Sequence, residues 1–222
     1  MIRAVLFDLD ETLIIRAGAI RAFIAGQYER FAGRLGGIDA ATYASRFLDM
    51  EDNGRIAKDK LYPDFVAAME ITGVSADELL EDYRQIYPSC AVLSDGARET
   101  VEAIHAQGLP VGVITNGNER VQRAKLESIG LTQLFNPIVI SEVVGMSKPD
   151  PAIFRLATSQ LGIDPAETLY VGDNPTVDIV GAAAAGLQTA WFRNGQPWPE
   201  GIIPRADVDI DALPELLHFP GR

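Results

Sequence analysis

The sequence contains a series of short apolar segments, each closed by polar or glycine residues, and this series restricts the chain to few folds. Five such segments occupy residues 2–9, 110–115, 137–141, 168–171 and 187–192. Continuous apolar runs of this length are typical of parallel strands that are buried on both faces. Because helical patterns separate them, the segments are expected to form right-handed βαβ units. The sequence therefore predicts an α/β fold, a three-layer domain around a doubly wound parallel sheet.

The stretches between these strands carry the signals that start and stop helices. Four helices are predicted in this way, over residues 95–107, 118–129, 150–162 and 176–185. Each ends at or next to a glycine, the residue that most readily closes a helix. A short strand near Val208 and a helix over 211–218 complete the predicted edge of the domain.

One long region interrupts the alternation of strands and helices. Between residues 15 and 88 no strand pattern is convincing, and four segments with helical spacing of apolar residues follow one another, at 21–35, 40–50, 61–71 and 76–86. Turn-forming glycine and Asp-Asn-Gly sequences separate them. We therefore expect a core domain made of residues 1–14 and 91–222, with a four-helix domain inserted at 15–90.

Composition narrows the partners and the compartment. The formal net charge of −12 over 222 residues argues against nucleic acid, because binding to a phosphate backbone requires an excess of Lys and Arg. No stretch is long and apolar enough to cross a membrane, and the start lacks the pattern of a signal peptide. The single cysteine, Cys90, fits a reducing compartment. We expect a cytoplasmic protein, and both a monomer and a homodimer remain open.

Polar side chains gather where the predicted strands end. In a doubly wound sheet, ligands bind beyond the carboxyl ends of the strands. The residues expected there are three or four carboxylates, one lysine and one hydroxyl-plus-amide group, namely Asp8, Asp10, Thr115, Asn116, Gly117, Lys148, Asp173 and Asp178.

The chemistry of this set points to phosphate. Neighbouring carboxylates repel one another unless a cation lies between them, and with no His or Cys in the set the expected cation is Mg²⁺. Lys148 would be a point charge for an anion, and Thr115 with the Asn116 and Gly117 amides would supply neutral donors to it. A carboxylate nucleophile, a second acid, Mg²⁺ and a lysine together describe phosphoryl transfer through an aspartyl-phosphate.

At this point the sequence resembles a known family. The segments Asp8-Leu9-Asp10-Glu11-Thr12, Thr115-Asn116-Gly117, Lys148-Pro149-Asp150 and Gly172-Asp173-Asn174-Pro175-Thr176-Val177-Asp178 resemble, in order, the four motifs of the haloacid dehalogenase superfamily. The helical insert resembles that family's cap of the helical-bundle type. The resemblance covers essentially the whole chain and implies a Rossmann-like core.

The resemblance implies a role for each motif residue. Asp8 would be the nucleophile and a Mg²⁺ ligand. Asp10 would protonate the leaving oxygen and then activate water, with its main-chain carbonyl on the metal. Lys148 would screen the repulsion between Asp8 and the phosphoryl group. Asp173 would ligate Mg²⁺ directly, and Asp178 either directly or through water.

The second motif and the choice of reaction follow from the same resemblance. Thr115 and Asn116 would bind the phosphoryl oxygens. Asp10 favours a phosphatase of small phosphorylated metabolites, or a phosphomutase of the β-phosphoglucomutase kind, over a 2-haloacid dehalogenase, since family dehalogenases usually lack this aspartate. A role as a binding or regulatory module is disfavoured, because a protein without enzyme activity needs no nucleophile, acid, lysine and metal site together.

Substrate choice is expected in the inserted helical domain. Residues 52–60 hold three basic side chains in an otherwise acidic chain. They read either as a solvated loop or as a loop from which Lys58 or Arg55 contacts the part of the substrate that is not phosphate. Arg16 and Arg21 are further candidates. The sequence does not name the substrate.

Overall fold

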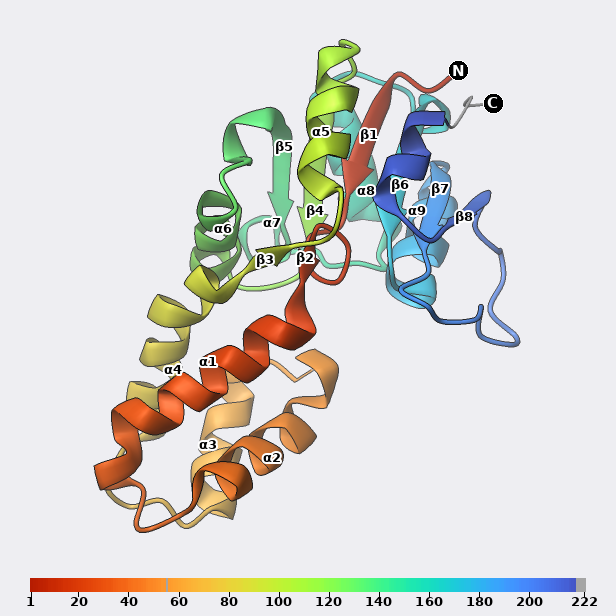
Figure 1. Cartoon of the computed structure of the whole chain (residues 1–222). Helices are drawn as coiled ribbons and strands as arrows, with labels where there is room; N and C mark the ends of the chain where they lie inside the picture. The colour runs from red at the N-terminus through yellow and green to blue at the C-terminus, as the bar shows by residue number, and fades with distance from the viewer. Residues whose placement is uncertain (55, 219–222) are drawn as a thin grey trace. The chain divides into compact units, whose positions relative to one another are not determined.

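The computed structural model describes residues 1–54 and 56–218, which form two compact units (Figure 1). The first, which we call the sheet unit, contains Met1–Ile15 and the chain from Leu93 onward. The second, the helical unit, is Arg16–Val92. Two short strands, β2 (Ile14–Ile15) and β3 (Val92–Leu93), pair with each other where the chain passes between the units.

The sheet unit is built on six parallel strands. They are β1 (Ala4–Phe7), β4 (Val111–Thr115), β5 (Phe135–Ile140), β6 (Thr168–Gly172), β7 (Gln188–Phe192) and β8 (Val208–Ile210). Their order is β5-β4-β1-β6-β7-β8, and every neighbouring pair is parallel. The chain adds strands on one side of β1 and then on the other, so the carboxyl end of β1 lies at the switch point where such sheets bind ligands. The predicted doubly wound parallel sheet is confirmed.

Helices cover both faces of this sheet. They are α5 (Ala97–Ala106), α6 (Glu119–Ser128), α7 (Ser141–Val144), α8 (Pro151–Leu161) and α9 (Gly181–Ala185). Leu6 and Tyr170 of the sheet pack with Phe154 of α8 and Ala182 of α9 in one buried cluster. Helix α5 lies across the opposite face (Figure 1). The three predicted layers are therefore present.

Two segments near the carboxyl terminus differ from the predicted helices. The helix expected over 176–185 is divided into a π-helical turn, Pro175–Val180, and α9. Asn174 caps the start of the turn, where its side-chain oxygen accepts from the amides of Thr176 and Val177. The helix expected over 211–218 is a 3-10 segment, Leu213–His218. The Glu215 carboxylate accepts hydrogen bonds from the amides of Asp211 and Ala212, just before this segment.

The helical unit contains the four predicted helices. They are α1 (Arg16–Phe31), α2 (Ala40–Glu51), α3 (Lys58–Ala68) and α4 (Ala76–Ile86). Helices α1 and α3 begin earlier in the chain than predicted, at Arg16 and Lys58. Across the part of the chain that the structure describes, no helix has the length and apolar character needed to span a membrane.

The side chain of Gln27 is the hub of a hydrogen-bond network in the aromatic core of the helical unit. Gln27 is fully buried, and its amide oxygen accepts hydrogen bonds from the hydroxyls of Tyr43 (3.0 Å) and Tyr62 (3.1 Å). Its amide nitrogen donates to the Leu79 carbonyl and to Asp82. The hub is therefore satisfied from within the unit, as a buried polar group must be.

Candidate active site

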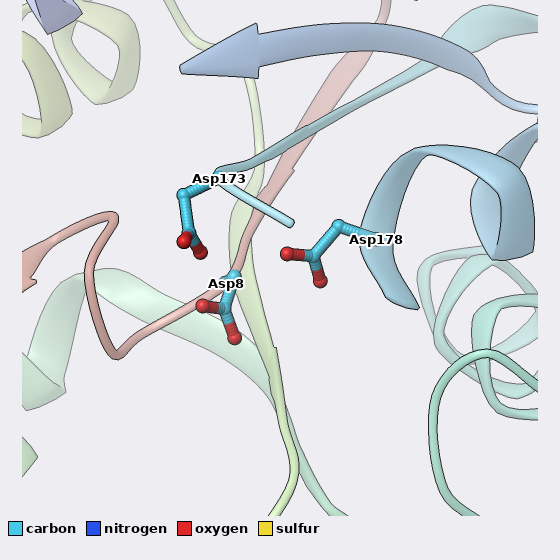
Figure 2. A group of neighbouring side chains, drawn as sticks. All are labelled: Asp8, Asp173 and Asp178. Atoms are coloured by element: carbon cyan, nitrogen blue, oxygen red, sulfur yellow. The ribbon is translucent and has the colours of Figure 1, made fainter. Parts of the chain in front are cut away.

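Three aspartates meet at the carboxyl ends of β1 and β6. Asp8 follows β1, Asp173 follows β6, and Asp178 lies on the π-helical turn beyond it (Figure 2). Each offers one carboxylate oxygen within 4.8 Å of those of the other two. We call these three residues the acidic trio. The predicted gathering of carboxylates at the strand ends is what the structure shows for these three.

The local chain is shaped to bring Asp178 back toward β6. The Asn174 backbone amide donates to Asp178 Oδ2 over 3.0 Å, which folds the turn onto its own start. Gly172 completes the approach, because a Cβ atom built there would lie only 2.5 Å from the Asp178 carboxyl carbon. A side chain at position 172 would therefore displace Asp178.

Lys148 supplies the buried cation of the site. Its ammonium donates to Asp8 Oδ1, to Asp178 Oδ1 over 2.7 Å and to the Tyr170 hydroxyl over 2.9 Å. Only 3% of the Lys148 side chain is exposed, so the ammonium is held by these partners rather than by water. Tyr170 was not predicted to take part. It lies in the interior of a buried strand, where an aromatic side chain is ordinarily only core.

The loop that carries Lys148 is fixed by Asn116. The Asn116 side-chain amide donates to the Lys148 carbonyl and accepts from the Lys148 amide, each over 2.9 Å. Asn116 therefore ties the end of β4 to the lysine loop. This is a structural use of the side chain that the sequence did not indicate.

The acidic trio carries more negative charge than Lys148 neutralises. Burial, with the nearby Asp178 carboxylate, raises the pKa of Asp8 to about 7 despite the Lys148 ammonium. Burial and the Asp178 and Asp8 carboxylates raise the pKa of Asp173 to about 8. Burial opposes the charge of Lys148, but Asp178 and Asp8 outweigh it and raise the pKa of that lysine. Two of the three carboxylates are thus disfavoured as anions in the absence of a further cation.

The donor set fits Mg²⁺. Its atoms are all carboxylate oxygens, they lie close enough to share one ion, and no sulfur or imidazole belongs to the group. A divalent ion would relieve the repulsion that raises the pKa of Asp8 and Asp173.

Thr115 and Gly117, the other predicted phosphate-binding residues, lie at the end of β4. The Thr115 hydroxyl is buried and accepts from Gln122 Nε2 over 2.5 Å. The Gly117 amide donates to the Ser141 hydroxyl over 2.9 Å, and Gly117 has a φ of +142°, which favours glycine. Their contacts to a phosphoryl group, and those of Asn116, stay predictions.

Asp10 stands apart from the acidic trio. Its two carboxylate oxygens each accept from Lys125 Nζ over 2.8 Å, and Oδ2 also accepts from Gln122 Nε2 over 3.0 Å. Gln122 and Lys125 lie within the helix predicted over 118–129, but no role was predicted for them. The signal that could have found them is their spacing, because two polar residues three positions apart share the face of α6 that also holds Val121 and Leu126.

Two of the four basic candidates, Lys58 and Arg16, are engaged within the helical unit. Lys58 Nζ donates to Glu51 Oε2 over 3.2 Å, and the Arg16 guanidinium also binds Glu51. Arg21 is exposed. Arg55 lies outside the described residues. The predicted contacts of Lys58 and Arg55 with substrate therefore stay predictions.

Comparison with known proteins assigns the family. Residues 2–186 match the haloacid dehalogenase-like hydrolase family. The chain belongs to this family. Its fold also matches the structure of a haloacid dehalogenase-type hydrolase from Bacillus subtilis bound to magnesium, with a TM-score of 0.79, 26% identity, and coverage of 98% of this chain and 97% of that one.

Curated relatives of this haloacid dehalogenase-like hydrolase align over nearly its full length. A ribulose-1,5-bisphosphate 5-phosphatase from Halopiger xanaduensis is 34% identical over 99% of this chain and 99% of its own. An N-acetylmuramic acid 6-phosphate phosphatase from Pseudomonas aeruginosa is 34% identical over 100% of this chain and 96% of its own. The chain is an enzyme of the phosphatase type within the family, as the resemblance of its motifs implied.

Proposed function

We propose that this enzyme is a Mg²⁺-dependent phosphatase that hydrolyses small phosphomonoesters through an aspartyl-phosphate on Asp8. The observation that carries the proposal is the acidic trio around the buried Lys148 at the carboxyl end of β1. An excess of carboxylates at a ligand-binding switch point suits a cation and, with it, an anionic substrate.

In the first step, an Asp8 carboxylate oxygen attacks phosphorus in line with the ester oxygen. The new bond joins Asp8 to phosphorus, and the bond from phosphorus to the ester oxygen breaks. Asp10, protonated at this stage, gives its proton to the departing oxygen, so that an alcohol leaves. Lys148, whose ammonium donates a hydrogen bond to Asp8, screens the repulsion between the carboxylate and the phosphoryl group.

In the second step, a water oxygen attacks phosphorus and Asp10 takes one of its protons. The bond between phosphorus and the Asp8 oxygen breaks, which releases inorganic phosphate and restores the Asp8 carboxylate. Thr115 and the backbone at Asn116 and Gly117 would hold the phosphoryl oxygens through both steps.

Asp8, Asp173 and the main-chain carbonyl of Asp10 would hold Mg²⁺, with Asp178 as a ligand directly or through water. The ion would supply positive charge to the phosphoryl oxygens during transfer. The magnesium-bound relative from Bacillus subtilis supports this choice of metal.

The relatives support a broad class of substrate and not a particular compound. The full-length relatives named above act on sugar phosphates, a bisphosphate and an amino-sugar acid phosphate. We propose that the substrate here is a small phosphorylated metabolite of comparable size, and that the helical unit contributes to its selection as a cap.

The test is phosphate release from a panel of sugar phosphates, nucleotides and phosphoglycolate, with Mg²⁺, with excess chelator, and beside Asp8→Asn. We expect release that needs the metal and falls at least about a thousandfold in the variant, because the amide is not a nucleophile. Near-normal rates in Asp8→Asn would contradict the nucleophile. Isomer interconversion without phosphate release would indicate a mutase, and halide release from 2-haloacids without metal would indicate a dehalogenase.

A further inference from the structure

Helix α6 presents two polar side chains to the interior of the sheet unit. Gln122 and Lys125 are three positions apart and are only 2% and 4% exposed. On the other side of the helix, Arg123 is 48% exposed and pairs with Glu119 one turn earlier. A lysine on the buried side of a surface helix is uncommon, because its ammonium loses water without the benefit that an apolar side chain would bring.

Both side chains converge on Asp10. Lys125 reaches both oxygens of the carboxylate, and Gln122 reaches one of them. The Asp10 side chain itself is 24% exposed, so it is open to solvent on one side while α6 holds it on the other. Three hydrogen bonds to one carboxylate restrict the rotation of its side chain.

Gln122 also joins Asp10 to the end of β4. The same Nε2 atom that binds Asp10 lies 2.5 Å from the Thr115 hydroxyl and 3.4 Å from the Asn116 carbonyl. Gly117 leaves the space for this, because a Cβ atom there would lie 3.3 Å from Gln122 Cγ and Cδ. One side chain therefore fixes the distance between the acid and the predicted phosphoryl-binding segment.

We infer that Lys125 and Gln122 are positioning residues that hold the Asp10 carboxyl group where it meets the leaving oxygen of the substrate. The inference rests on the proposed function and names residues of that same site. It follows from the geometry because a general acid acts only within hydrogen-bond reach of the oxygen that it protonates. A carboxyl group that is already held in that position loses no further conformational entropy when the substrate reacts.

The experiment compares two phosphomonoesters whose leaving groups differ in their need for an acid. A primary alkyl phosphate releases a strongly basic alkoxide unless it is protonated, whereas 2,4-dinitrophenyl phosphate releases a stable anion. The value of kcat/KM reports the transfer to Asp8, the step in which the leaving group departs. It is measured for both esters in the native enzyme, in Lys125→Met and in Arg123→Met, a matched loss of a cation from the exposed side of α6.

The inference predicts that Lys125→Met lowers kcat/KM for the alkyl ester at least about tenfold and for the dinitrophenyl ester less than about threefold. Arg123→Met should leave both values within about twofold of the native enzyme. Lys125→Arg, which keeps the charge and the donors, should recover most of the alkyl-ester rate. Gln122→Leu should show the same selectivity with a smaller loss.

Other results would overturn the inference. Equal losses for the two esters would mean that Lys125 supports the fold or the metal site rather than the acid. Unchanged or higher rates with the alkyl ester would mean that α6 does not position Asp10 for catalysis. If Lys125→Met does not fold, the same comparison is made with Lys125→Arg and Gln122→Leu. The deciding quantity is then the loss of kcat/KM for the alkyl ester divided by the loss for the dinitrophenyl ester. A native enzyme inactive on both esters and on the wider panel would overturn the proposed function, and the inference with it.

Discussion

Each unit of this enzyme buries a cluster in which one charged side chain is shared by several of opposite sign, and the two clusters are balanced in opposite ways. In the helical unit, one carboxylate, Glu51, lies between two cations, Arg16 and Lys58. In the sheet unit, the three carboxylates of the acidic trio lie together with one cation, Lys148, which pairs with Asp8 and Asp178. All six charged partners of the two ion-paired networks are at most 12% exposed at the side chain: Arg16, Glu51, Lys58, Asp8, Lys148 and Asp178.

The difference appears in the pKa of the carboxyl groups. Burial would raise the pKa of Glu51, but hydrogen bonds and charges from Arg16 and Lys58 outweigh it and lower that pKa. Burial wins for Asp8 and Asp173, whose pKa values rise to about 7 and about 8. A cluster that its own protein neutralises supports the fold, whereas a cluster left with excess charge is prepared for a cation from outside.

The largest effect on stability is expected from breaking the balanced cluster. Glu51→Gln would leave Arg16 and Lys58 buried without their shared anion, which should lower the free energy of unfolding by about 3–5 kcal/mol. Denaturant unfolding followed by circular dichroism measures it. Glu102→Gln, which removes the anion of an exposed pair with Arg98, is the control and should cost less than about 1 kcal/mol. A cost as small as the control's would contradict the structural role of Glu51.

Removing one carboxylate from the acidic trio should act in the opposite direction. Asp173→Asn takes away a charge that repels Asp8 and Asp178, so the metal-free protein should melt at the same temperature or a few degrees higher. The same change should weaken Mg²⁺ binding more than about tenfold, because it removes a ligand oxygen. Thermal melts with and without Mg²⁺ measure both effects. A strongly destabilised metal-free variant would show that Asp173 supports the fold instead.

A smaller effect should appear in the pH dependence of the metal-free protein. Because the pKa values of Asp8 and Asp173 are raised above 3.8, the folded state binds protons more tightly than the unfolded state. Stability should therefore increase as the pH falls from about 8.5 to about 6. Glu51, whose pKa is lowered from 4.5, contributes stability that is lost only at more acidic pH, as the pH falls through its folded pKa.

This pH dependence is measured by thermal melts in chelator and again in saturating Mg²⁺. The metal should flatten the curve, since it keeps both carboxylates ionised. In chelator, Asp173→Asn should make the dependence of stability on pH weaker, because one of the two carboxyl groups with a raised pKa is gone. Stability that falls from pH 8.5 to pH 6 in chelator would contradict the excess of negative charge.

Sequence patterns were sufficient for the sheet and for its strand ends. The strands are continuous apolar runs that end in polar residues, so both their position and the gathering of Asp8, Asp173 and Asp178 could be predicted. The side chains that contact these carboxylates and Asp10 could not be predicted. Tyr170 is interpreted as core, because a single hydroxyl leaves the apolar pattern of its strand almost unchanged. Lys125 is interpreted as helix surface, because a charged side chain is ordinarily solvated.

The helical unit shows the same limit from the other side. Lys58 was predicted in a loop with other basic residues, but α3 begins there and Glu51, a residue at the end of α2, binds its ammonium. The partner of a charged side chain lies in another helix, and helical periodicity within one segment carries no information about it. The one sequence signal for Glu51 is its position on the face of α2 that also holds the apolar residues Tyr43 and Phe47.

The number of protons released when Mg²⁺ binds shows whether a metal ion completes the acidic trio. Calorimetric titration of Mg²⁺ into the metal-free enzyme at about pH 7, in two buffers with different heats of ionisation, gives that number. With pKa values of about 7 and about 8, Asp8 and Asp173 are partly protonated at this pH, so Mg²⁺ should bind and displace protons into the buffer. Binding without proton release, or equal binding by the native enzyme and Asp173→Asn, would contradict an acidic trio that a metal ion completes.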